Sequence, residues 1–328
     1  MIQFILNRWV KYHVSSDTVK EFEDCVKLSD SIITINNKKI NSEFAFFIYR
    51  VLRKLKLLTL LKPILNLTKG NAVYFVILMG PDFRLSLPFF FLNGQKNVYL
   101  FDAWTYTHSS ILQYAETLKI KNIFLSSSEA VENLKKYNSK CDFYWIPEGI
   151  DPAKYFFKEY SEKDIDVIQI GRKYDSYHDR ILCCLNKENR VYFYEKKKGE
   201  IIFPFRKDFL DGLARSKVSI CFPSNITHPE RAAGIETMTV RYLQSIASKC
   251  LIVGKAPREM IKLFGYNPVI DADMKNPEEQ LLSILHNYEK YHSLIEQNLN
   301  SLINHTWIIR WKQIKEIIGR NLIYSRIF

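Results

Sequence analysis

The stretch from residue 227 to residue 257, THPERAAGIETMTVRYLQSIASKCLIVGKAP, holds residue types that could bind a phosphorylated sugar. A polar loop runs into a short helical pattern, and the first N–H groups of a helix lack partners and carry partial positive charge. The turn could therefore hold a diphosphate while Glu236 accepts hydrogen bonds from sugar hydroxyls, which is nucleotide-sugar chemistry. The alternative is an ordinary loop, capped by Thr237 or Thr239, before an amphipathic helix. The candidate contacts are Gly234, Ile235, Glu236, Thr237 and Met238.

A second candidate site follows the strand-like run 166–170, where Gly171 and Arg172 come next in the chain. Ligands of open α/β sheets bind at the carboxyl ends of strands, and an arginine there suits a phosphate. Lys173 and Arg180 could assist it. The alternative is a surface arginine paired with a neighbouring aspartate.

A third candidate is the stretch 201–206, IIFPFR, which reads as a strand followed by a turn. Backbone groups of Phe205 and Arg206 could bond the edge of a nucleobase, with Phe203 or Phe205 in apolar contact. Plain core aromatics are the alternative interpretation.

The candidate site residues lie between apolar runs that alternate with helix-like stretches, and these elements would hold them in place. Such alternation favours parallel sheets with crossover helices, so the sequence predicts an α/β protein with two Rossmann-like domains facing each other across a cleft. The expected strands are 31–35, 72–79, 97–101, 122–126, 143–146, 166–171, 190–194, 218–222, 250–253 and 268–270, and helical segments are expected at 277–287 and 288–318.

The length of 328 residues also favours two domains, and the chain becomes polar after IPEGIDP at 146–152. We place one domain at 1–155 and the other at 156–328. The last helix is expected either to stay with the second domain or to pack back on the first.

Composition narrows the class of protein. A net charge of +12 indicates an anionic partner, whether nucleic acid, membrane or phosphate-bearing substrate. Nucleic acid is disfavoured because the lysines are spread and no zinc-finger spacing, RNP-like motif or repeat occurs. The six cysteines show no CxxC spacing and are expected to be buried thiols. Since the N-terminus lacks a secretion-signal pattern, we expect a cytoplasmic location.

The segment Phe44–Leu58 is apolar and basic together, with Arg50, Arg53, Lys54 and Lys56. These cations make it a poor transmembrane span, but such a helix could lie in an anionic membrane interface. The alternative is a domain helix with a solvated basic face.

Four stretches carry a resemblance to a known family: IPEGIDP at 146–152, DVIQIGRK at 166–173, IIFPF and FLDGLARSKVSICFPS within 201–224, and residues 227–257. Together they resemble the retaining GT-B glycosyltransferases, especially the branch with a short C-terminal glycosyltransferase domain. In the first half the resemblance rests on Phe101–Trp104 and on IFLSSSEAV at 123–131. It implies an acceptor domain at 1–155 and a nucleotide-sugar donor domain at 156–328.

In that superfamily two glutamates, separated by seven residues, contact the transferred sugar and the ribose hydroxyls. The matching positions here are Glu236 and Gln244. Glutamine keeps an acceptor and a donor for a ribose diol but loses the charge-assisted bond. A weaker donor affinity, an altered donor or an inactive homologue could follow.

The first half departs from the pattern, because no glycine-rich loop follows an early strand. Asp102, with Trp104 and His108 close behind, is the candidate catalytic group facing the cleft; its alternative role is to cap a helix.

No metal or cofactor is expected. Neither Asp164-Ile165-Asp166 nor Asp271-Ala272-Asp273 fits a metal-binding pair, and no HExxH, GxSxG or GxxxxGK[ST] occurs. Cationic side chains and helix-start amides would stabilise the leaving diphosphate instead of Mg²⁺.

The resemblance thus implies a glycosyltransferase that moves a sugar, with retention, from a nucleoside diphosphate-sugar to a glycan or lipid-linked acceptor. Its expected setting is bacterial cell-surface polysaccharide synthesis, peripheral on the inner face of the cytoplasmic membrane. A non-catalytic homologue that binds glycan or serves as a partner subunit is the main alternative. A Rossmann-type oxidoreductase or epimerase is disfavoured because neither half has a GxGxxG after its first strand.

Overall fold

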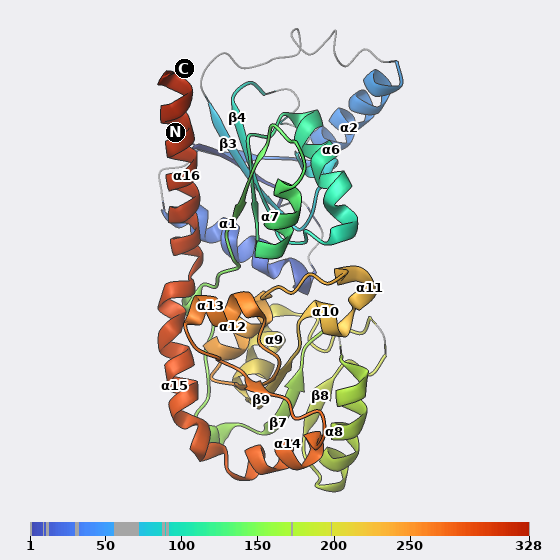
Figure 1. Ribbon diagram of the computed structural model, residues 1–328, viewed down its shortest axis with the longest axis vertical. Coiled ribbons are helices and arrows are strands. Elements are labelled where there is room, and N and C mark those ends of the chain that lie inside the picture. The colour runs from blue at the N-terminus through green and yellow to red at the C-terminus, as the bar shows by residue number, and fades with distance from the viewer. Residues whose placement is uncertain are drawn as a thin grey trace. The chain divides into compact units, whose positions relative to one another are not determined.

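The structure is a computed structural model of the 328-residue chain. It divides by backbone contacts into two compact units (Figure 1). Unit 1 comprises Met1–Tyr12, Val19–Pro147 and Trp311–Phe328, and unit 2 comprises His13–Thr18 and Glu148–Arg310. The division after residue 155 stays a prediction. The structure describes all residues except 1, 9, 11–12, 30–32, 56–71, 87–88, 90–91, 172, 198 and 328, and it does not describe the side chains of 15, 40–42, 45, 49, 53 and 321–327.

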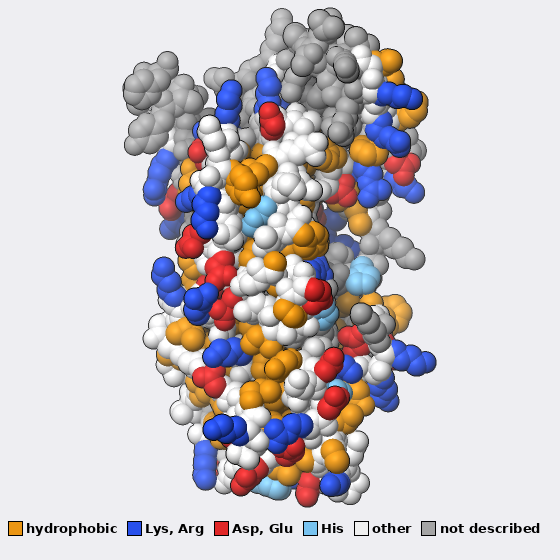
Figure 2. Space-filling view, turned by 45° about the vertical axis from the view of Figure 1, so that its right-hand side comes forward, with side chains coloured by type: hydrophobic (Ala, Val, Ile, Leu, Met, Phe, Trp, Pro, Cys, Tyr) orange, Lys and Arg blue, Asp and Glu red, His pale blue; other side chains and the backbone are white. Residues whose placement is uncertain are grey.

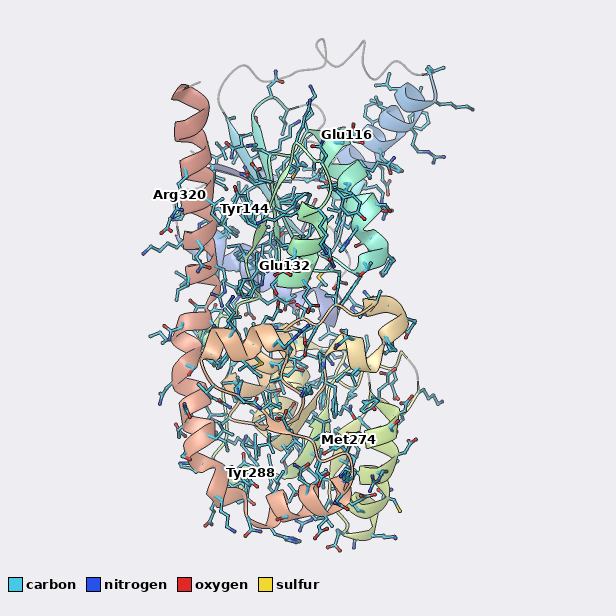
Figure 3. All side chains as sticks on the ribbon, in the orientation of Figure 1. Glu116, Glu132, Tyr144, Met274, Tyr288 and Arg320 are labelled. Atoms are coloured by element: carbon cyan, nitrogen blue, oxygen red, sulfur yellow. The ribbon has the colours of Figure 1, made fainter. Side chains whose placement is uncertain are left out.

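Unit 1 is built on a parallel sheet of order β2-β1-β3-β4-β5-β6. All six residues of β3 are buried, and Phe75 at its centre stacks on Phe4 with ring centroids 5.8 Å apart. Toward the sheet edge, Tyr144 of β6, which is labelled in Figure 3, stacks on Phe124 of β5 with ring centroids 5.7 Å apart. The elements of this part of the chain are β1 (Ile2–Leu6), η1 (Val14–Ser16), α1 (Asp17–Ser29), β2 (Ile33–Asn36), α2 (Lys39–Lys54), β3 (Val73–Leu78), α4 (Phe83–Ser86), β4 (Gln95–Leu100), η2 (Thr105–Thr107), α6 (His108–Leu118), β5 (Asn122–Leu125), α7 (Ser128–Lys135) and β6 (Asp142–Trp145).

Unit 2 contains a second parallel sheet, of order β11-β10-β9-β7-β8. Val167, Val218 and Leu251 lie in its core, which α8 and α14 help to cover. The elements of the chain after residue 147 are η3 (Pro152–Lys154), η4 (Tyr160–Glu162), β7 (Ile165–Gln169), α8 (Asp175–Lys187), β8 (Tyr192–Tyr194), α9 (Arg206–Ala214), β9 (Ser216–Cys221), α10 (Ser224–Thr227), α11 (Pro229–Ala232), α12 (Val240–Ala247), β10 (Leu251–Gly254), α13 (Arg258–Phe264), β11 (Ile270–Asp271), α14 (Pro277–His286), η5 (Tyr288–Tyr291), α15 (His292–Ser301), η6 (Leu302–His305) and α16 (Trp307–Ile327). From Trp311 on, α16 belongs to unit 1.

The predicted α/β class and every expected strand are confirmed, and the N-terminal strand β1 is an addition. β1 lies between β2 and β3, which explains why its last three residues are buried. The helical stretch expected at 288–318 is interrupted, since α15 ends at Ser301 and α16 begins at Trp307.

The expectation that the cysteines are buried is wrong in part. Cys25, Cys141, Cys221 and Cys250 are buried, whereas Cys183 is exposed and Cys184 is partly exposed. Both of the latter lie on α8, whose buried side is instead formed by Tyr177, Ile181 and Leu185.

Candidate functional site

The sheet of unit 2 contains a topological switch point between β7 and β9. The chain continues from β7 to the neighbouring β8 on one side, and from β9 to β10 on the other. Open parallel sheets bind ligands outside the carboxyl ends of their strands at such a point. Gly171 follows β7 here, and Pro223 follows β9.

Arg241, in the first turn of α12, connects that helix to the end of β7. Its Nη1 donates to the carbonyl of Ile170 at 2.7 Å. Gly171 has a φ of +76°, and a Cβ added there would lie 3.1 Å from Arg241 Nη1. A glycine therefore suits both the left-handed backbone and the guanidinium beside it.

The turn before α12 contains two consecutive residues with left-handed backbone conformation, the second of which is a glycine. Ala233 and Gly234 both have left-handed backbone, with φ of +46° and +88°. A Cβ on Gly234 would meet nothing within 4 Å, so backbone angle rather than space favours glycine at this position. Ile235, which follows, is buried.

Thr237 and Met238 are buried and bonded to α13. The Met238 N–H donates to Glu259 Oε1 at 2.6 Å, and the Thr237 hydroxyl donates to the same oxygen at 2.8 Å. Glu259 is itself only 6% exposed. These two predicted donor contacts thus have a partner within the protein, and in this structure they fix the shape of the turn.

The start of α12 is also occupied by a carboxylate. The Val240 N–H donates to Glu148 Oε2 at 2.6 Å. Glu148 belongs to the IPEGIDP motif and is buried. A carboxylate at a helix N-terminus is favourable because it meets unpaired N–H groups and the positive end of the helix dipole.

Glu236 is mostly buried in this turn and pairs with an exposed arginine. Its Oε2 is 2.9 Å from Arg258 Nε, and the side chain of Arg258 is 79% exposed whereas that of Glu236 is 11% exposed. An ion pair with so exposed a partner contributes little to stability. The side chain of Arg258 can therefore turn away from this carboxylate at small cost.

Gln244 forms part of a buried chain of contacts. Its Nε2 donates to the hydroxyl of Tyr155 at 3.1 Å, and the guanidinium of Arg206 lies over the Tyr155 ring at 5.1 Å. Arg206 Nη1 is in turn 3.5 Å from Asp17 Oδ2. The structure thus brings Gln244 and Arg206 together through Tyr155.

The aromatic stretch before α9 divides into a packed residue and an exposed one. Phe203 stacks on Phe193 at 5.8 Å and lies against Gly212. Phe205 precedes the first residue of α9 and is 66% exposed. Lys173 Nζ lies 5.3 Å from the centre of the Tyr194 ring, at the end of β8.

Arg172 lies outside the described residues, so its predicted phosphate contact stays a prediction. Arg241, Tyr155, Glu148 and Glu259 are the residues that sequence reasoning missed. The IPEGIDP motif contains Glu148 and is a sequence signal for it. Arg241 stands within the predicted corner, but only the folded chain places its side chain at the end of β7.

Asp102 belongs to unit 1, where it follows β4 and is partly buried. His108 behind it is buried, and burial lowers the pKa of its imidazole. A cavity of about 430 Å³ lies at the neighbouring end of β3, lined in part by Gly80, Asp82 and Thr107. This open cavity is the candidate acceptor site of unit 1.

Within the part of the chain that the structure describes, no three His, Cys, Asp or Glu side chains come together as a metal site. Over the same residues, no helix combines the length and apolar character needed to span a membrane.

No protein-family model and no curated protein matches the sequence. Solved structures do match over the whole chain. Anabaena HepE, in complex with UDP and glucose, is 10% identical with a TM-score of 0.62, and the alignment covers 97% of this chain and 99% of HepE. Sucrose-phosphate synthase from Thermosynechococcus elongatus is 9% identical with a TM-score of 0.55 and 99% coverage of both chains.

A glycosyltransferase from Rickettsia africae is 12% identical with a TM-score of 0.54, and 98% of each chain is covered. Two parallel α/β sheets with these structural neighbours give the chain the GT-B fold.

Proposed function

We propose that this chain is a glycosyltransferase that moves a sugar from a nucleoside diphosphate-sugar to a glycan or lipid-linked acceptor, with retention. The observation that carries the proposal is the corner at the switch point of unit 2, where Glu236 pairs with the exposed Arg258 and Arg241 reaches the end of β7. The UDP and UDP-glucose bound to HepE structures support a nucleotide-sugar donor.

Under this proposal the site residues have four roles, one for each part of the donor. Glu236 accepts hydrogen bonds from hydroxyls of the transferred sugar, and Gln244 offers its amide to the ribose. Its Oε1 has no partner among the described residues, while its Nε2 is bonded to Tyr155. Phe205 and Arg206 lie beside the base, and Arg172, Lys173, Gly234 and Ile235 face the diphosphate.

The chemical step needs no side-chain nucleophile. The acceptor hydroxyl oxygen forms the new bond to the anomeric carbon as the bond to the diphosphate oxygen breaks, and the acceptor's proton passes to the departing diphosphate. Cationic side chains stabilise the negative charge on this leaving group, so we propose a metal-independent reaction without a cofactor. Asp102 is proposed to act on the acceptor side.

The test is a panel of uridine, guanosine and adenosine sugar nucleotides with the full chain. A bound donor at 100 times its Kd should raise the free energy of unfolding by about 2.7 kcal/mol. Turnover of one donor with a glycan acceptor supports the enzyme. Binding without any turnover favours the non-catalytic alternative, and the absence of binding contradicts the proposed enzyme. An ultraviolet spectrum that shows bound nicotinamide or flavin would favour the oxidoreductase.

We further propose that the protein is cytoplasmic and binds the inner face of the cytoplasmic membrane, where it acts in surface-polysaccharide synthesis. Three apolar side chains at one side of α2 and its end support this: Phe44 and Phe47 are 64% exposed, and Leu55 is 58% exposed. Arg50 and Lys54 are exposed beside them. Residues 56–58 of the predicted segment lie outside the described residues.

Vesicle sedimentation tests the membrane proposal. The double variant Arg50→Gln/Lys54→Gln should bind phosphatidylglycerol-containing vesicles about 2 kcal/mol more weakly, since each cation near an anionic surface contributes about 1 kcal/mol. Lys135→Gln/Lys136→Gln, at the exposed end of α7, is the matched control and should bind as the parent does. Equal binding of all three proteins would show that α2 is an ordinary domain helix.

A further inference from the structure

We propose that Arg241 binds the diphosphate of the donor with its guanidinium. This inference rests on the proposed function and assigns to Arg241 a role that no sequence motif suggested. Three independent observations about its side chain support it: its place in the sheet, the absence of a carboxylate partner among the described residues, and the glycine beside it.

The first observation is position. Arg241 Nη1 bonds the carbonyl of Ile170, the residue that follows the last residue of β7. β7 and β9 are the neighbouring strands whose connections leave to opposite sides of the sheet. The guanidinium therefore lies at the point of an open parallel sheet where phosphate-bearing ligands are expected.

The second observation is charge. Arg180, Arg215 and Arg258 in the same unit are each paired with a carboxylate. Arg241 is partly buried, and its one hydrogen bond among the described residues goes to a neutral carbonyl. Removing a permanent cation from water without an anionic partner is unfavourable. A bound anion would provide that partner.

The third observation is shape. Gly171 turns with a φ of +76°, and a side chain there would crowd Arg241 Nη1 at 3.1 Å. The backbone between β7 and Arg172 thus leaves room for the guanidinium. In addition, the Val240 N–H at the start of α12 already donates to Glu148 and is not available to a phosphate. A side-chain donor such as Arg241 would then have to supply more of the phosphate contacts.

The chemistry follows from the geometry of the side chain. A guanidinium has five N–H groups in a planar fork, and only one of them is bonded to Ile170. Two parallel N–H groups can therefore bind two oxygens of the diphosphate. The same contact strengthens as the diphosphate gains charge on leaving the sugar.

Calorimetry on the full chain tests the proposal with UDP, GDP and ADP as probes. For the nucleotide that binds the parent, Arg241→Gln should weaken affinity by about 10- to 100-fold, the range for hydrogen bonds to a charged group. Arg241→Lys keeps the charge but loses the fork, and it should weaken affinity by about 3- to 10-fold.

Arg215→Gln is the matched control. Arg215 comes just before β9, at the amino end of that strand and not at the carboxyl end where the donor is proposed to bind, and it pairs with Asp164. It should bind the nucleotide as the parent does. Thermal unfolding without ligand shows which variants are folded. If folded Arg241→Gln binds as tightly as the parent, the assignment is overturned while the proposed function stands. If Arg241→Gln does not fold, equal affinity of Arg241→Lys overturns it. If the parent binds none of the three nucleotides, both proposals fail.

Discussion

Glu236 and Gln244 are placed so that their separate roles can be tested one side chain at a time. Glu236 has an exposed arginine as partner, whereas Gln244 is buried against Tyr155. Glu236→Ala should depress sugar transfer strongly and leave affinity for the free nucleoside diphosphate nearly intact, because that ligand lacks the sugar. Full transfer activity in this variant would remove Glu236 from the donor site.

Gln244→Ala should have the opposite effect, weakening nucleoside diphosphate binding by about 1 kcal/mol for one neutral hydrogen bond. Gln244→Glu should maintain or tighten binding if a ribose diol is the partner, since an ionised acceptor bonds more strongly. Calorimetric titration of both variants decides this. Unchanged affinity in Gln244→Ala would place the ribose elsewhere.

Tyr155→Phe should weaken nucleoside diphosphate binding although Tyr155 is not proposed to contact the ligand itself. The lost hydroxyl leaves the Gln244 amide without its 3.1 Å partner, so the amide is no longer held with Oε1 toward the ligand. A loss of about 0.5–1.5 kcal/mol is expected in calorimetry. The 2′-deoxy nucleotide should lose less than the ribonucleotide, whereas equal losses would indicate a general structural effect.

His305 should make stability depend on pH. Burial and the neighbouring Arg310 lower the pKa of its imidazole from 6.5 to about 4. Between these values the unfolded chain binds a proton that the folded chain does not, so stability falls as pH decreases from 6.5 toward 4. Urea unfolding of His305→Asn should show a smaller decrease over that range than the parent. A parent and variant with parallel pH profiles would contradict the assignment.

At this scale the sequence suggests candidates whose spacing is local, such as Glu236 and Gln244 in one helix-start motif, and their roles stay predictions. It did not predict Tyr155, which meets Gln244 across 89 positions of chain, or the bond from Arg241 to Ile170 across 71. Partners at such separations depend on the register of the sheet, and one sequence carries no signal for them.

Among the elements, α13 holds the candidate corner in place through one carboxylate. Glu259→Ala would leave the Met238 N–H and the Thr237 hydroxyl without their shared acceptor in a buried site. The free energy of unfolding should fall by about 2–3 kcal/mol, the cost of unsatisfied buried polar groups. Denaturant unfolding measures this loss. Glu279→Ala, exposed on α14, should change it little, and an equal loss in both variants would contradict the role of Glu259.

The elements themselves were predictable where apolar runs are bounded by polar turns, as in β3 and β10. β1 was missed because a strand at the first residues of the chain has no preceding turn to mark it. The break between α15 and α16 was missed because Thr306 pairs with Ile150 in an isolated bridge, a long-range contact that no local pattern indicates.

For the whole molecule, the net charge of +12 is distributed rather than gathered into one patch on the visible face (Figure 2). Nucleotide binding is therefore expected to depend on the corner of unit 2 and not on a broad basic surface. Hydrogen exchange with a saturating nucleoside diphosphate should show new protection in residues 224–247. Protection confined to the strands of unit 1 would contradict the donor site proposed here.

The division into units has a consequence for the order in which the protein can fold during synthesis. Residues 311–328 belong to unit 1, where Trp311 packs against Phe75 with ring centroids 5.0 Å apart. The ribosome makes these residues after all of unit 2. The sheet of unit 1 is therefore synthesised first, but the part of α16 that packs on it is synthesised last. Until then β3 lacks the fully buried Trp311, and a core aromatic of this size is worth about 3–5 kcal/mol. A free chain truncated after residue 310 should therefore expose unit 1 to protease while unit 2 is resistant.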